Sequence, residues 1–124
     1  GGNDLLRGLP PVQARENLRK ILVAAQASDV QVLLIGMQAP GNFGPEYKAQ
    51  FDRIYADLAQ EFDALLHADA FAGIRAAAGS DPAAAQPYMQ PDNIHPNAKG
   101  VALTVAALGP VVLDLVARIN QADS

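Results

Sequence analysis

The sequence predicts an α/β fold in which helices pack on a parallel sheet. Amphipathic helical stretches alternate with short apolar runs rich in β-branched residues, an order typical of this fold class. The 124 residues suffice for one domain with one modest core, and no repeat or linker divides them. Because half of the residues are hydrophobic and 18% are charged, the composition excludes a disordered tail.

The first half of the chain is predicted to form a helix, a strand and a second helix. Pro10-Pro11 suits the first turn of a helix, and the apolar residues from Val12 to Ala27 share one face. Val30 to Gly36 is a nearly continuous apolar run, which predicts a strand buried on both faces. Gln38 to Pro45 has the composition of a loop, and a helix is expected from Pro45 to about Phe62.

The second half is less regular. Ala64-Leu65-Leu66 indicates a short strand, Phe71 to Ala78 a helical turn or two, and Gly79 to Gln90 a loop. A tight polar turn is expected from Asp92 to Pro96. Asn97 is a good N-cap for a closing helix, which Gly109-Pro110 should break or kink.

Composition also excludes several classes of function. The net charge is -4 and the basic residues are scattered, so phosphate-backbone binding is not expected. Cysteine is absent, and His67 and His95 have no close Cys or His companions, so no metal site is predicted. No transmembrane segment is predicted, because Gly109-Pro110 and Asp114 interrupt the most apolar stretch, Val101 to Ala117.

One candidate for chemistry is the segment Asp92-Asn93-Ile94-His95-Pro96. A histidine acting as general base needs one nitrogen free and the other fixed in its tautomer. A carboxylate three residues earlier, across a tight turn, can accept a hydrogen bond from Nδ1–H and stabilise the imidazolium that forms. Such a spacing also arises by chance, and a surface ion pair is then the plainer interpretation.

The other candidate is the segment Gly1-Gly2-Asn3-Asp4, which the composition predicts to be a loop. An Asn side-chain amide can donate to an oxyanion developing on an ester carbonyl, and neighbouring glycines let the backbone approach a substrate. A plain turn without catalytic function is the alternative.

Taken together, the two segments make the chain resemble the SGNH/GDSL hydrolases. Gly-x-Asn-Asp resembles the third signature block of that family and Asp-x-x-His-Pro the fifth, in the same order and with a similar wide separation. The similarity is greatest to the bacterial thioesterase/arylesterase/lysophospholipase L1 branch. It extends to Leu6-Arg7-Gly8, Pro40-x-Asn42-x-Gly44, Glu61-Phe62-Asp63 and Asn97.

The resemblance implies a three-layer α/β/α flavodoxin-like SGNH hydrolase fold with a parallel sheet, of which residues 1–124 would be the C-terminal part, without the N-terminal strands. It implies ester, thioester or lysophospholipid hydrolysis through a Ser-His-Asp triad, with no cofactor. His95 would be the base, Asp92 would orient it, and Asn3 would donate in the oxyanion hole. The residues implied to contact substrate are Gly2, Asp4, Leu5, Leu6 and Pro40. The loop Met37 to Gly44 would flank the pocket.

The family's first two blocks, including the Gly-Asp-Ser-Leu serine, are absent from this sequence. Ser28, Ser80 and Ser124 lack the strand-to-helix turn that exposes a nucleophile, so none is expected to be catalytic. We therefore expect an upstream segment that carries the serine and central strands of the sheet. Localisation is left open. Relatives of this branch are often periplasmic or exported, so the resemblance points to such a location.

Two other functions compete with hydrolysis. One is a non-catalytic α/β fragment or assembly module, which would pair specifically without any reactive serine. The other, dinucleotide binding, is disfavoured because no Gly-x-Gly-x-x-Gly follows a strand. His67 is predicted to be a structural or surface histidine and not a catalytic one. Tyr88 and Met89 could line an acyl pocket, and local packing explains them equally well.

Overall fold

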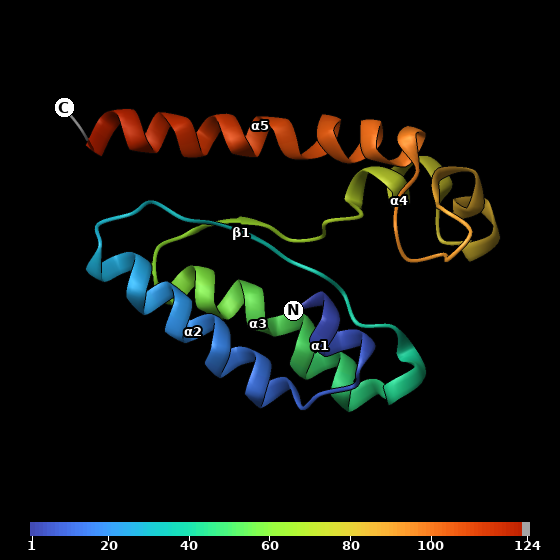
Figure 1. The fold of residues 1–124 in the computed structure, drawn as a ribbon, viewed down its shortest axis with the longest axis horizontal. Helices are drawn as coiled ribbons and strands as arrows, with labels where there is room; N and C mark the ends of the chain where they lie inside the picture. Colours follow the sequence, from blue (N-terminus) through green and yellow to red (C-terminus); the bar gives the residue numbers. More distant parts are fainter. Residues whose placement is uncertain (123–124) are drawn as a thin grey trace.

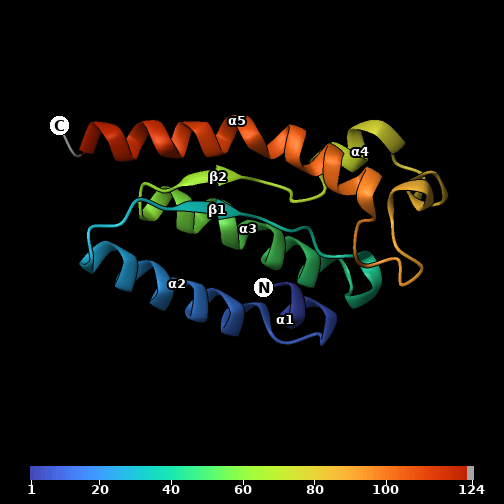
Figure 2. The ribbon, with the colours of Figure 1, turned by 45° about the horizontal axis from the view of Figure 1, so that its top comes forward.

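Two short parallel strands lie between helices in the computed structural model, which describes residues 1–122 (Figure 1). Figure 2 shows helix α5 on one side of the strands and helices α2 and α3 on the other. Along the chain the elements are α1 (Gly2–Leu6), α2 (Pro11–Ala27), β1 (Leu33–Ile35), η1 (Gly41–Phe43), α3 (Pro45–Glu61), β2 (Leu65–His67), α4 (Ala72–Ala78), η2 (Pro82–Tyr88) and α5 (Ala98–Ala122). The predicted α/β class with a parallel sheet is confirmed.

The sheet is smaller than the apolar run Val30 to Gly36 suggested. β1 pairs with β2 in the register Leu33 with Leu65, Leu34 with Leu66 and Ile35 with His67. Leu34 is buried, but Ile35 is 43% exposed, so the expectation of burial on both faces is wrong for this strand. The reason is that β1 has a neighbouring strand on only one side within residues 1–122.

The core lies between the sheet and helices α2 and α3. The most completely buried large side chains all come from α3, where Phe51, Ile54 and Leu58 are at most 1% exposed. Their spacing of three and four residues places them on one face of the helix, as the sequence pattern predicted. Leu22 of α2 and Leu34 of β1 belong to the same buried cluster.

Helix α5 is longer than predicted. It runs from Ala98 to Ala122 without a break at Gly109-Pro110, so the predicted break is wrong, and a kink there stays a prediction. Pro110 cannot donate to the carbonyl of Ala106, but Ala106 is exposed, and water can satisfy that oxygen. The continuous helix crosses the sheet and contacts both strands.

Much of the apolar surface of α5 is uncovered. Val101, Val105, Leu113, Val116 and Ile119 are each 41–69% exposed. By length and composition α5 could cross a membrane, with a mean hydropathy of 2.0 over its most apolar window, of which 6% is buried. Length and composition are weak evidence for a single helix, and the prediction that no segment crosses a membrane stays a prediction.

Candidate active site

The turn from Asp92 to Pro96 brings a carboxylate and an imidazole together. Asp92 Oδ1 accepts the backbone N–H groups of Ile94 at 2.9 Å and His95 at 3.0 Å, and its Oδ2 lies 2.6 Å from His95 Nδ1. Asn93 adopts a positive φ of 56°, a conformation that Asn tolerates better than most residues. The sequence thus folds locally so that one short turn fixes the position of the imidazole ring.

Hydrogen bonding gives the pair a defined protonation pattern. The backbone N–H of His95, its side chain and the N–H of Ile94 together lower the pKa of Asp92 from 3.8 to about 2. Asp92 is therefore ionised at neutral pH and can only accept, so the neutral imidazole carries its proton on Nδ1. The Nε2 lone pair of His95 is then free to take a proton, and the ring is 68% exposed.

Contacts on both sides hold this turn in place. Gln90 N–H donates to His95 O at 2.8 Å, and Met89 pairs with Pro96 in an antiparallel bridge. Asn97 Oδ1 accepts Gly100 N–H at 3.1 Å, and the Asn97 amide donates to the carbonyls preceding the turn. Asn97 thus caps α5 as predicted and ties the histidine turn to that helix.

The segment Gly1 to Asp4 is the start of the short helix α1, so its expected loop conformation is wrong. In this helix the N–H of Leu5 donates to the carbonyl of Gly1, and the N–H of Arg7 donates to the carbonyl of Asn3. A Cβ atom on Gly1 would lie 2.1 Å from Tyr55 Oη, so only glycine fits against this buried ring of α3. This close packing holds α1 against the core, while Asn3 on the same helix stays exposed.

A pocket of about 1050 Å³ joins the two predicted segments. Its lining includes His95, the predicted oxyanion donor Asn3 and, from the predicted substrate-contacting set, Gly2, Leu5, Leu6 and Pro40. Met37 and Met89 also line it, whereas Tyr88 does not. The pocket lies beyond the carboxyl ends of β1 and β2, the usual ligand position in parallel α/β folds.

Two of the predicted site residues do not line this pocket. Asp92 contacts His95 from outside the pocket lining, which is the position expected of a residue that orients the imidazole. Asp4 is not brought to the pocket, and it lies close enough to Tyr55 to contribute, after burial, to the raised pKa of that phenol.

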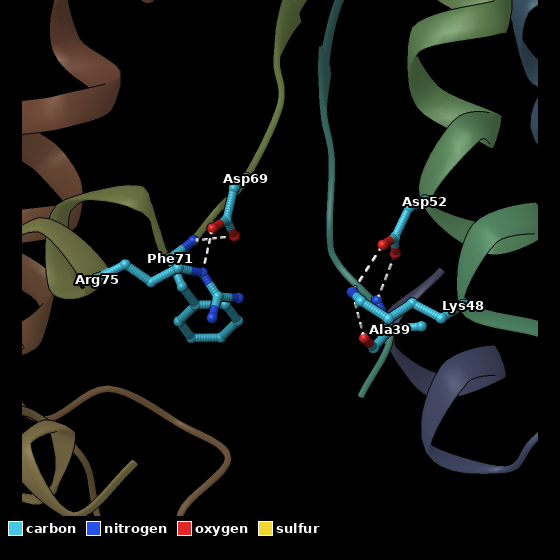
Figure 3. A network of polar contacts seen from close by, with 6 residues as sticks. All are labelled: Ala39, Lys48, Asp52, Asp69, Phe71 and Arg75. Carbon is cyan, nitrogen blue, oxygen red and sulfur yellow. Dashed lines mark hydrogen bonds and ion pairs between the residues drawn. The ribbon is translucent and has the colours of Figure 1, made fainter. Parts of the chain in front are cut away.

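Two charged clusters at the ends of the strands were not predicted from the sequence (Figure 3). After β1, Asp52 of α3 accepts Ala39 N–H at 2.7 Å, and Lys48 bonds both Asp52 and Ala39 O. After β2, the buried Asp69 accepts Phe71 N–H at 3.0 Å and pairs with Arg75. Neither spacing is a recognised motif. Burial of Asp69, and the bond from the buried Ala39 N–H to Asp52, distinguish these clusters from surface ion pairs.

The segment after α4 also lines the pocket, although no function was predicted for it from the sequence. Gly79, Ser80, Ala83, Ala85 and Gln86 belong to the lining. Most of them are small residues in and before η2, and their composition alone resembles that of an ordinary variable loop.

The remaining His and Ser residues do not complete a triad within residues 1–122. His67 is half-buried in β2, away from the pocket lining, and its buried Nε2 has no partner there. Ser28 and Ser80 make no hydrogen bond to His95, and Ser124 lies outside the described residues. In the described part of the chain no three His, Asp or Glu side chains gather as metal ligands would.

The chain is similar to known proteins. The model of the GDSL-like lipase/acylhydrolase family matches residues 1–103. The chain belongs to this family. Esterase TesA of Pseudomonas aeruginosa is 42% identical over 96 residues, which are 77% of this chain and 44% of that protein. Thioesterase 1/protease 1/lysophospholipase L1 of Escherichia coli K12 is 38% identical over 97 residues, covering 78% and 43%.

The solved structures agree with the fold. A crystal structure of TesA superimposes with a TM-score of 0.73 at 34% identity, covering 93% of this chain and 59% of that one. This GDSL family chain therefore has the α/β SGNH hydrolase fold, with a small parallel sheet. It spans less than half the length of the two relatives whose sequences it matches.

Proposed function

We propose that this chain supplies the aspartate and the histidine of a catalytic triad, together with an oxyanion donor, to a serine hydrolase that cleaves acyl esters or thioesters. The observation that carries the proposal is the Asp92–His95 pair at a pocket that also contains Asn3. The nucleophilic serine would come from a segment preceding Gly1. This chain together with that segment is called the complete protein below.

The chemistry follows from the geometry of the turn. His95 Nε2 takes the proton of the serine Oγ as this oxygen attacks the acyl carbonyl. Asn3 Nδ2–H donates to the oxyanion of the tetrahedral intermediate. The imidazolium, stabilised by Asp92, returns the proton to the leaving alcohol or thiol as the C–O or C–S bond breaks. Water then attacks the acyl-serine with the same base, which releases the acid and regenerates the serine.

The uncovered apolar surfaces support a further segment of sheet. β1 has an unpaired edge within residues 1–122, and Ile35 beside it is 43% exposed. The exposed valines and leucines of α5 lie on the helix that covers the same sheet. Strands added at the β1 edge would cover both, at roughly 25 cal/mol per Å² of apolar surface removed from water.

Matched histidine variants of the complete protein test the proposal. His95→Ala should lower kcat/KM for phenyl hexanoate by several orders of magnitude, because the members of a triad act as a unit. His67→Ala, in a strand outside the pocket lining, should leave kcat/KM within about threefold. Full activity of the His95→Ala protein would contradict the assignment.

A further inference from the structure

Arg75 enters the wall of the pocket with most of its hydrogen-bond donors unused. It lines the pocket, and its side chain is 53% exposed. Its side-chain partner within residues 1–122 is Asp69, which accepts only from Nε. The two Nη groups of a guanidinium carry four further N–H donors, and among residues 1–122 no acceptor is recorded for them.

A buried carboxylate fixes the position of this guanidinium. Asp69 is 7% exposed, and each of its oxygens is engaged, Oδ1 by Phe71 N–H and Oδ2 by Arg75. Figure 3 shows Arg75 extending from α4 to the carboxylate of Asp69, with its guanidinium beside the ring of Phe71. Because Asp69 holds Nε, the planar guanidinium is pre-oriented, and a ligand that binds the Nη groups loses little side-chain entropy by doing so.

The other ionisable side chains of the pocket lining have different tasks. Asp81 accepts Ala83 N–H at 3.0 Å and caps η2, and His95 pairs with Asp92. Most of the remaining lining is apolar. A pair of free, parallel N–H donors in such a wall matches the two oxygens of a carboxylate.

We propose that Arg75 binds a carboxylate carried by the substrate and makes the complete protein prefer anionic esters to neutral esters of equal length. This inference rests on the proposed hydrolase function. The carboxylate can be carried by the acyl part or by the alcohol part, and both present the same two oxygens to the guanidinium.

Three esters separate these cases. Phenyl hexanoate is neutral, phenyl hydrogen adipate carries a carboxylate on the acyl part, and 4-(hexanoyloxy)benzoate carries one on the alcohol part. The measured quantity is kcat/KM for each anionic ester divided by kcat/KM for phenyl hexanoate. Charge-assisted hydrogen bonds have energies that correspond to about tenfold to a hundredfold in this ratio.

The variants are Arg75→Gln, Arg75→Lys and the control Arg53→Gln. Arg75→Lys keeps a cation to pair with Asp69, which protects the fold, but it leaves no planar pair of donors for the substrate. Arg53 is exposed on α3 outside the pocket lining, so its variant makes the same change of charge elsewhere. We expect both Arg75 variants to lower the ratio at least tenfold for one anionic ester, and Arg53→Gln to leave it unchanged.

Unchanged ratios for both anionic esters, with hydrolysis of phenyl hexanoate intact, would overturn the inference while leaving the proposed function standing. Absence of hydrolysis of all three esters by the unmodified protein would instead reject the proposed function. Titration calorimetry with adipate then decides the inference, which requires binding at least tenfold weaker in Arg75→Gln than in Arg53→Gln. Equal binding would overturn it.

Discussion

Asp92 Oδ2 lies 2.6 Å from His95 Nδ1, and the other oxygen of the same carboxylate accepts two backbone N–H groups of the turn. One side chain thus both shapes the turn and holds the imidazole that the turn carries. Because the backbone bonds act without the histidine ring, the two roles of Asp92 can be separated experimentally.

The pKa of Asp92 should be measurable as about 2 by ¹³C NMR titration. A carboxyl group with a lowered pKa stabilises the fold above its unfolded pKa, and this contribution is lost as the pH falls through the folded pKa. The turn should therefore loosen between pH 3.8 and about 2. In His95→Ala the pKa of Asp92 should rise but stay below 3.8, since the backbone bonds remain. A pKa of 3.8 in the unmodified protein would contradict the observed hydrogen bonding.

Asn97 should stabilise both α5 and the histidine turn. Asn97→Ala removes the cap on Gly100 N–H and two donations from the Asn97 amide, and should lower the free energy of unfolding by about 1–2 kcal/mol. Asn97→Asp keeps the cap acceptor but not the donors, so urea unfolding should show a smaller loss. Equal losses in the two variants would mean that the cap contributes nothing.

Gly1→Ala should displace α1, because the new Cβ would meet Tyr55 Oη at 2.1 Å. A shift of about 1 Å in the Asn3 donor is expected to lower kcat about tenfold to a hundredfold. Tyr55→Phe in the same protein removes the atom that clashes and should restore part of the activity.

The control for this substitution is Gly41→Ala, where nothing lies within 4 Å of the new Cβ. Its kcat should match that of the unmodified protein. If Gly1→Ala also left kcat unchanged, the close packing of α1 on Tyr55 would have no part in positioning Asn3.

Asp52 should anchor the loop that follows β1. Asp52→Ala leaves the N–H of Ala39, a residue only 3% exposed, without its acceptor, and should cost about 1–3 kcal/mol in urea unfolding. It should also raise KM, because the neighbouring Pro40 lines the pocket. Asp57, on the same helix, makes an exposed ion pair with Arg15, so Asp57→Ala should cost about 1 kcal/mol or less. Similar costs for the two variants would contradict the anchoring role.

Local patterns predicted most of the fold. The apolar spacing of Phe51, Ile54 and Leu58 is enough to define α3 and its buried face, and Asn97 marks the start of α5. The continuity of α5 through Pro110 was not predictable, since it depends on whether water reaches the Ala106 carbonyl. The helical state of Gly1 to Asp4 likewise depends on the fit against Tyr55, which is distant in sequence.

The candidate site, like the fold, was predictable from the sequence only in part. Asp92 and His95 are adjacent across one turn, so their hydrogen bond follows from sequence spacing. That Asn3 shares a pocket with His95 depends on how α1 and the closing turn meet at the end of the sheet. Arg75 could not be singled out from the sequence. Its role depends on pairing with a buried Asp69, and that burial is a tertiary property.

The central claim is that Asp92 and His95 serve a serine that lies outside this chain. The most direct test treats the complete protein with a fluorophosphonate probe, digests it, and locates the labelled residue by mass spectrometry. The account predicts one label on a serine upstream of Gly1, with labelling abolished in His95→Ala. A label on Ser80, which lines the pocket, would contradict the account. So would the absence of any label, which would favour a non-catalytic assembly module.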